Sequence, residues 1–131
     1  MLLVKNAEIY APEYLGKKDL LICGGKIECI QDSIRELPVE CEVLDAEGKI
    51  LTPGFLDQHV HITGGGGEGS FHTRTPELQM SELVENGITT VVGLLGTDGI
   101  TRSVENLVAK ARALTEEGMT VYALTSAYGY P

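Results

Sequence analysis

The sequence has few basic residues and no long apolar run. Of its 131 residues, 10 are lysine or arginine and 19 are aspartate or glutamate, which gives a formal net charge of −9. Nucleic-acid binding needs a basic surface, so this balance argues against DNA or RNA as a partner. No segment approaches the roughly 20 apolar residues of a membrane-spanning helix, and residues 1–6 lack the basic start of a signal peptide. We therefore expect no membrane partner.

Cysteine is also scarce. Cys23, Cys29 and Cys41 are an odd number and contain no Cys-x-x-Cys pair. This argues against a disulfide framework and against a cysteine-based zinc knuckle. We interpret the three residues as reduced, mostly buried thiols, and the sequence thus predicts a cytoplasmic protein.

The first fifty residues have the pattern of short β-strands separated by turns. The β-prone segments are residues 2–4, 7–10, 19–23, 26–30, 41–44 and 49–52. Gly24-Gly25 suits a tight hairpin between the third and fourth of them, and residues 45–48 form another turn. The pattern predicts a small sheet or sandwich rather than a catalytic core.

After Pro53-Gly54 strands and helices alternate. Apolar runs at 55–61, 89–95 and 120–125 predict strands, and helical spacing predicts helices at 76–86 and 103–117. Ser103 is the expected N-cap of the second helix, and Gly87 and Gly118 are stop signals. This order predicts an α/β fold with a parallel sheet. A complete (β/α)8 barrel takes about 250 residues, so we expect the front part of a larger barrel rather than a small open sheet.

The motif that points to chemistry is His59-Val60-His61, followed by four glycines and Glu68. Residues two apart on a strand point to the same face, so both imidazoles could hold one metal ion. The glycines would let the backbone approach a bound molecule. The alternative is a pair of histidines hydrogen-bonded in a core. Asp57 shares the parity of the histidines and either orients a ligand or is a polar residue satisfied by backbone.

Several separated motifs resemble a known family. Residues 53–61, PGFLDQHVH, resemble the first-strand motif of the amidohydrolase superfamily, metal-dependent hydrolases built on a (β/α)8 barrel with a small β-sandwich. Residues 59–68, 73–77, 91–98 and 124–128 together resemble the isoaspartyl dipeptidases. The resemblance covers nearly the whole chain. It implies the N-terminal part of a small β-sandwich domain at 1–52 and the first βα units, about three strands, of a truncated TIM-type barrel at 53–131.

The resemblance also implies a metal centre and a reaction. Two zinc ions, bridged by a hydroxide and a carboxylated lysine, would hydrolyse β-aspartyl dipeptides, and His59 and His61 would bind one of the ions. The lysine, two further histidines and an aspartate base do not lie within these 131 residues. We therefore expect the chain alone to be inactive. The intact enzyme would be a homo-oligomer with a small peptide substrate.

The substrate residues implied by the resemblance follow the glycine run and the later strands. Gly66, Gly67 and Glu68 would contact the aspartyl end, with Glu68 pairing with its α-ammonium group. Thr97 would hydrogen-bond the substrate, and Tyr128 would be catalytic, donating to the carbonyl oxygen as it gains negative charge.

Each assignment has an alternative. Glu68 could be a solvated loop residue, Thr97 a turn residue or helix cap, and Tyr128 an amphipathic residue at a domain edge. The runner-up function is a dihydroorotase- or hydantoinase-like cyclic amidase. A non-catalytic truncated barrel module is the alternative from another class.

Overall fold

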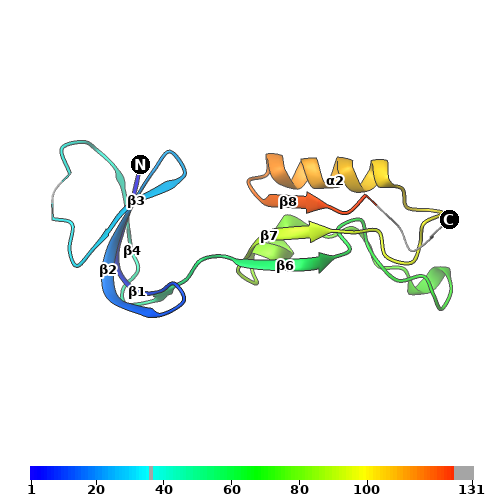
Figure 1. The fold of residues 1–131 in the computed structure, drawn as a ribbon, viewed down its shortest axis with the longest axis horizontal. Helices are drawn as coiled ribbons and strands as arrows, with labels where there is room; N and C mark the ends of the chain where they lie inside the picture. The colour runs from blue at the N-terminus through cyan, green and yellow to red at the C-terminus, as the bar shows by residue number, and fades with distance from the viewer. Residues whose placement is uncertain (36, 126–131) are drawn as a thin grey trace. The chain divides into compact units, whose positions relative to one another are not determined.

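The computed structural model describes residues 1–35 and 37–125. The chain divides between Pro53 and Gly54 into two compact units, and Figure 1 labels their main strands and helix α2. No helix in these ranges is long and apolar enough to cross a membrane. Each unit is built around its own sheet.

The first unit is a five-stranded sheet. Its strands are β1 (Leu2–Tyr10), β2 (Tyr14–Cys23), β3 (Lys26–Gln31), β4 (Glu42–Asp45) and β5 (Ile50–Leu51). The order is β3-β2-β1-β4, and β5 also pairs with β1. The β1–β2 and β2–β3 pairs are antiparallel, whereas β4 and β5 run parallel to β1. The predicted hairpin at Gly24-Gly25 is confirmed, with φ angles of 56° and 76° that a primed turn requires.

Strand β1 joins two segments that the sequence suggested as separate pieces. Its pairing register shifts between Val4 and Ala7, and Asn6 lies in the shift with a positive φ of 58°. The backbone N–H of Asn6 donates to the carboxylate of buried Asp19 at 2.9 Å, and its side-chain amide donates to Asp45. The bulge is thus satisfied by side chains, and the strand continues beyond it.

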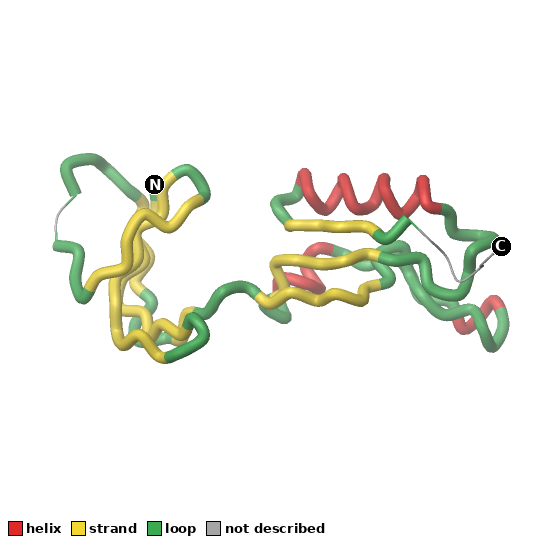
Figure 2. Tube along the Cα trace, viewed as in Figure 1, coloured by secondary structure: helices red, strands yellow, loops and turns green. Residues whose placement is uncertain are grey.

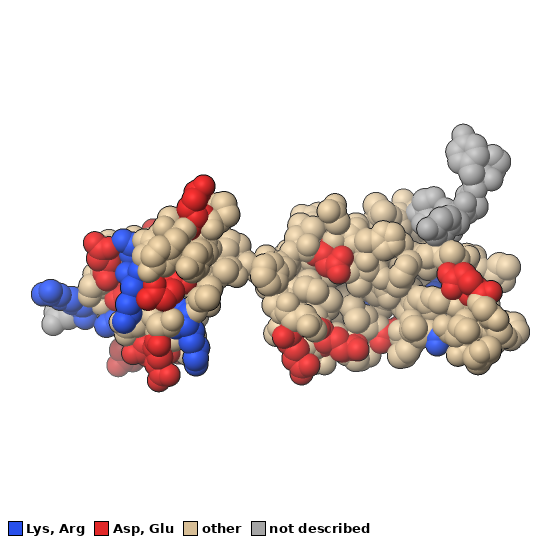
Figure 3. Space-filling view, turned by 90° about the horizontal axis from the view of Figure 1, so that it is seen from below, with Lys and Arg blue, Asp and Glu red and all other residues tan. Residues whose placement is uncertain are grey.

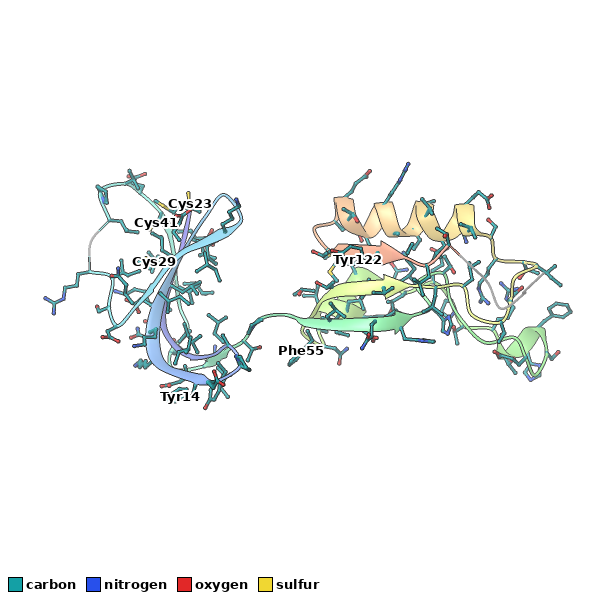
Figure 4. The ribbon with its side chains drawn as sticks, viewed as in Figure 1. Tyr14, Cys23, Cys29, Cys41, Phe55 and Tyr122 are labelled. Atoms are coloured by element: carbon teal, nitrogen blue, oxygen red, sulfur yellow. The ribbon has the colours of Figure 1, made fainter. Side chains whose placement is uncertain are left out.

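The three cysteines are free, as predicted, but the prediction that they are mostly buried is wrong. Cys23 is exposed, and Cys29 and Cys41 are partly exposed; all three are labelled in Figure 4. Cys23 ends β2 at the hairpin, Cys29 lies on the outer strand β3, and Cys41 precedes β4 at the other edge. These positions are at the margin of the sheet, whereas its core is formed by Val4, Ala7, Ile9 and Leu20.

The second unit has the predicted order of strands and helices. It contains β6 (Phe55–Val60), the short 3₁₀ helix η1 (Phe71–Thr73), α1 (Met80–Val84), β7 (Ile88–Gly93), α2 (Val104–Glu116) and β8 (Thr120–Ala123). The three strands form a parallel sheet in the order β6-β7-β8. Figure 2 shows the yellow strands side by side, with the red helix α2 lying along them. The predicted α/β class with a parallel sheet is confirmed.

Helix α2 begins and ends where the sequence predicts. The Ser103 side chain accepts the N–H of Asn106 at 3.2 Å, which caps the first turn. Gly118, with a φ of 107°, follows the last turn. The face of α2 that carries Leu107 and Leu114, both fully buried, packs into the core of the second unit. The rest of that core comprises Ile62, Leu83, Val91, Leu95, Ala111 and Met119.

Helix α1 is much shorter than the predicted segment 76–86. The N–H of Leu78 donates to Ile62 O at 3.2 Å, which draws the preceding chain into a contact with the loop after β6. The helix starts only after Gln79, whose N–H is accepted by the Glu82 carboxylate at 2.7 Å in a capping box. It stops before Gly87, as predicted.

Candidate metal and substrate site

The candidate residues gather at the carboxyl edge of the parallel sheet. Strands β6 and β7 end there, and the loops 61–79 and 94–103 follow them. In Figure 2 these loops are the green segments at one end of the second unit. In α/β barrels this edge carries the reactive groups.

His59 and His61 lie close together. Their ring centroids are 5.4 Å apart, and the planes meet nearly edge to face at 86°. Nδ1 of His61 is 3.4 Å from the carbonyl oxygen of Leu94. A hydrogen on Nδ1 that donates to this carbonyl leaves the lone pair on Nε2, the tautomer used by many metal-binding histidines.

Asp57 acts on the backbone of the motif. Its carboxylate accepts the N–H of His59 at 3.0 Å. Of the two alternatives for Asp57, the observed contact matches a polar residue satisfied by backbone, and it holds the main chain at His59 in place.

The two imidazoles fit a zinc ion as a partial ligand set. Neutral ring nitrogens are common zinc ligands, and a zinc site normally needs three or four protein ligands. Within residues 1–35 and 37–125, no group of three or more His, Cys, Asp or Glu side chains could hold a metal ion. The pair therefore needs further ligands from elsewhere.

The run of glycines after His61 is needed because another stretch of backbone, residues 73–76, lies too close for side chains. Gly64 and Gly66 have φ angles of 85° and 69°. A Cβ at Gly64 would lie 2.3 Å from Thr75 O, and one at Gly66 would lie 2.3 Å from Thr73 O. Gly65 is fastened to the same segment, because its N–H donates to the hydroxyl of Thr75 at 2.7 Å.

The glycine loop is held by Arg102, a residue that the sequence did not single out. Its guanidinium binds backbone carbonyl groups of the loop. Arg102 is only 4% exposed. Nε donates to Thr63 O at 3.1 Å, and Nη2 donates to Gly65 O at 3.1 Å and Thr75 O at 3.3 Å. Nη1 lies 3.5 Å from Gly66 O. The one sequence signal is a cation directly before a helix N-cap, where the helix dipole disfavours positive charge.

Asp98 joins Arg102, which lies in the same loop after β7, to Arg74 in the loop after β6. The Asp98 carboxylate lies 2.9 Å from Arg74 Nη1 and 3.5 Å from Arg102 Nη1. It also accepts the hydroxyl of Thr101 and, at 2.8 Å, the backbone N–H of Thr101. The Thr101 hydrogen bonds, with a smaller contribution from Arg74, lower the pKa of Asp98 to about 2. The carboxylate is therefore charged throughout the physiological range.

Glu68 and Thr97 meet across the two loops. The hydroxyl of Thr97 donates to the Glu68 carboxylate. This bond is the largest cause that lowers the pKa of Glu68 below its ordinary value, and a hydrogen bond from its own backbone and the charge of Arg102 add smaller contributions. Glu68 is thus an exposed anion held in a defined position.

A hollow of about 510 Å³ opens beside this pair. Phe71 and Ile100 give it apolar surface, and its polar lining comes from Glu68, Arg74, Thr97, Asp98 and Thr101. Figure 3 shows one face of the molecule, with acidic side chains in red scattered over the second unit and little blue. Of the predicted substrate residues, Glu68, Thr97 and Gly67 all line this one hollow. Tyr128 lies outside the described residues.

Comparison with known proteins relates this arrangement to a family. No family model matches the chain. A crystal structure of beta-aspartyl dipeptidase from Fervidobacterium islandicum AW-1, in complex with beta-Asp-Leu dipeptide, is 51% identical with a TM-score of 0.89, and the match covers 97% of this chain and 33% of that one. A second structure of beta-aspartyl dipeptidase from the same organism is 52% identical with a TM-score of 0.91, covering 97% and 35%.

Curated relatives are named for a different reaction. Dihydroorotase from Listeria monocytogenes serotype 4a is 35% identical over 134 residues, which is 98% of this chain and 30% of that protein. The chain thus spans about a third of the length of the proteins it matches. The higher identity to the dipeptidase confirms the predicted resemblance and the predicted fold, the start of a barrel preceded by a small β-sandwich. In sequence and fold the chain belongs to the amidohydrolase superfamily and is similar to the N-terminal third of beta-aspartyl dipeptidase.

Proposed function

We propose that the chain forms the N-terminal third of a metal-dependent isoaspartyl dipeptidase that cleaves β-aspartyl dipeptides. The observation that carries the proposal is the Glu68–Thr97 pair, an oriented carboxylate at the edge of a hollow. The 51% identity to a beta-aspartyl dipeptidase with a bound beta-Asp-Leu dipeptide supports the same substrate class. Residues 1–52 would be the start of the β-sandwich and 53–131 the start of the barrel.

The charge of Glu68 favours a dipeptide over a cyclic amide. A β-aspartyl dipeptide carries a free α-ammonium group, whereas the ring of a dihydroorotase or hydantoinase substrate has no such cation. Because its pKa is lowered, Glu68 is ionised at neutral pH and suits a charge-assisted hydrogen bond to an ammonium. Thr97 and the backbone at Gly66 and Gly67 would hold the rest of the aspartyl end.

His59 and His61 would be two ligands of the zinc centre in the intact enzyme. The remaining ligands, including the carboxylated lysine, would come from the rest of the protein. When bound, the metal pair would lower the pKa of a water molecule and polarise the scissile carbonyl. Tyr128 would donate a hydrogen bond to that carbonyl oxygen. We place the intact homo-oligomeric enzyme in the cytoplasm, in keeping with its three free cysteines.

The test uses the full-length enzyme and the substitution Glu68→Gln, which keeps the side-chain shape and removes the charge. We expect the wild type to hydrolyse β-Asp-Leu in preference to dihydroorotate and hydantoin. The variant should lose about 10- to 100-fold in kcat/KM, the loss expected for a hydrogen bond to a charged group. Glu116→Gln, at the last turn of α2, is the matched control and should behave as wild type.

Two results would count against the proposal. If Glu68→Gln leaves β-Asp-Leu cleavage unchanged, the carboxylate does not bind the ammonium. If the wild type prefers a cyclic amide, the dihydroorotase-like alternative, supported by the 35% identical relatives, is correct. A full-length protein without turnover of either substrate class would favour a non-catalytic barrel.

A further inference from the structure

We propose that Arg102 is a positioning residue that sets the geometry between Glu68 and Thr97 for recognition of the substrate ammonium. The proposal rests on the proposed function. At 4% exposure, Arg102 cannot itself offer its guanidinium to a substrate. It acts through the two loops that it joins.

The first loop is held through its carbonyl groups. Arg102 binds the carbonyl oxygens of Gly65 and Gly66, at 3.1 Å and 3.5 Å. Glu68 follows two residues after Gly66, so Arg102 holds the backbone two residues before the carboxylate. Gly67, the residue between them, has a φ of 108°, and the Arg102 guanidinium donates to the carbonyl groups of Thr63, Gly65, Gly66 and Thr75 instead.

The second loop is held through Asp98. The carboxylate of Asp98 lies 3.5 Å from the Arg102 guanidinium, and Asp98 directly follows Thr97. The same carboxylate caps the turn at Thr101. One buried cation therefore restrains the chain on both sides of the Glu68–Thr97 hydrogen bond.

Only arginine can make this set of contacts. A planar guanidinium presents five donors in a fixed fork, and here three of its nitrogens reach four carbonyl oxygens and one carboxylate. A lysine has a single nitrogen and would leave some of these buried acceptors without a partner. A buried cation is costly unless it is paired and hydrogen-bonded, so the site is built for this side chain.

The experiment compares two substrates of the full-length, metal-loaded enzyme. β-Asp-Leu carries the α-ammonium, and succinyl-leucine has the same amide without it. The readout is the ratio of their kcat/KM values in wild type, Arg102→Lys, Arg102→Met and Glu68→Gln. Arg112→Lys and Arg112→Met, on the exposed part of α2, are the matched controls.

We expect the preference for β-Asp-Leu to fall at least about tenfold in both Arg102 variants, mainly through KM, and to stay unchanged in the Arg112 controls. The double variant Arg102→Lys, Glu68→Gln should have almost the same preference as Glu68→Gln alone, because both substitutions disable the same interaction with the ammonium. If Arg102→Met does not fold, Arg102→Lys retains the charge and gives the same readout.

A purely structural role predicts something different. If the Arg102 variants lose kcat/KM equally for both substrates and so keep the wild-type preference, or if only their melting temperature falls, Arg102 does not position the ammonium site. That result overturns this proposal and leaves the proposed function standing. If the wild type has no preference for the substrate with the amine, the proposed function fails as well.

Discussion

Gly96 leaves no room for a side chain beside the ring of His61. A Cβ at Gly96 would lie 2.5 Å from Cε1 and 2.8 Å from Nδ1 of the imidazole. A Cβ at Gly65 would lie 3.2 Å from Cδ2 of the same ring. The two loops of the site thus pack closely against one histidine, and the backbone of both fixes its orientation.

Gly96→Ala should displace the His61 ring and weaken metal binding. We expect zinc affinity of the full-length enzyme to fall about 10- to 100-fold, as for other changes that disturb the groups orienting a metal ligand. Competition with a chelator measures this. Gly118→Ala is the control, since Gly118 also has a positive φ but nothing within 4 Å of its Cβ position. Equal zinc affinity in both variants would mean that Gly96 is required only for its backbone conformation.

Thr97→Val should change the pH dependence of the proposed dipeptidase activity. The Thr97 hydrogen bond is the largest cause that lowers the pKa of Glu68, so its loss raises that pKa. In the proposed function the ionised form of Glu68 binds the substrate ammonium, so the acid limb of the kcat/KM profile should move to higher pH. Thr97→Ser keeps the hydroxyl and should retain the wild-type limb. An acid limb in the same place for Val and Ser would contradict the assignment.

Because of the Asp98 carboxylate, the free energy of unfolding should fall at low pH. The pKa of Asp98 is lowered to about 2 in the folded chain, so the stabilisation is fully present above the ordinary pKa of an aspartate and is lost as the pH falls through about 2. Asp98→Asn removes the ionisable carboxyl group and with it this pH-dependent stabilisation. The unfolding free energy of the variant, from urea titrations at pH 2 to 5, should fall less on acidification than that of the wild type. Parallel pH dependences would show that the Thr101 and Arg74 contacts do not stabilise the ionised form.

Thr63 carries the one side-chain oxygen in the described ranges that is buried without a hydrogen-bond partner. Thr63→Val replaces it with a methyl group, and we expect the free energy of unfolding to stay equal or to rise by about 1 kcal/mol. Thr75→Val is the matched contrast. The Thr75 hydroxyl accepts the Gly65 N–H at 2.7 Å, so its loss should cost about 1–3 kcal/mol. A large loss of stability in Thr63→Val would reveal a partner for this hydroxyl.

Local signals in the sequence predicted the elements that frame the site. Ser103 and Gly118 mark the ends of α2, the β-branched run marks β7, and the His-x-His spacing places both rings together at the end of β6. These features depend on residues a few positions apart. They can be recognised because the side chain that caps or alternates is next to the backbone that it serves.

Features that depend on distant partners were not predictable in the same way. The shortening of α1 follows from a backbone contact between Leu78 and Ile62, and the role of Arg102 follows from carbonyl groups up to 39 residues away. Every residue has a backbone carbonyl, so the residue type does not show which carbonyl groups accept these hydrogen bonds. The partial exposure of Cys29 and Cys41 likewise follows from strand order, because β3 and β4 lie at the edges of their sheet, whereas Cys23 is exposed at the end of β2, next to the hairpin turn.

The guanidinium of Arg102 and all its carbonyl partners belong to one continuous stretch of chain, with a largest separation of 39 residues. All of these residues lie in the second unit, ahead of the further metal ligands that the proposed function takes from the rest of the protein. The part of the proposed site that would bind the ammonium is therefore translated before the part that would complete the metal centre. Recognition of the substrate amine and binding of the catalytic ions would thus be encoded in separate segments of the chain.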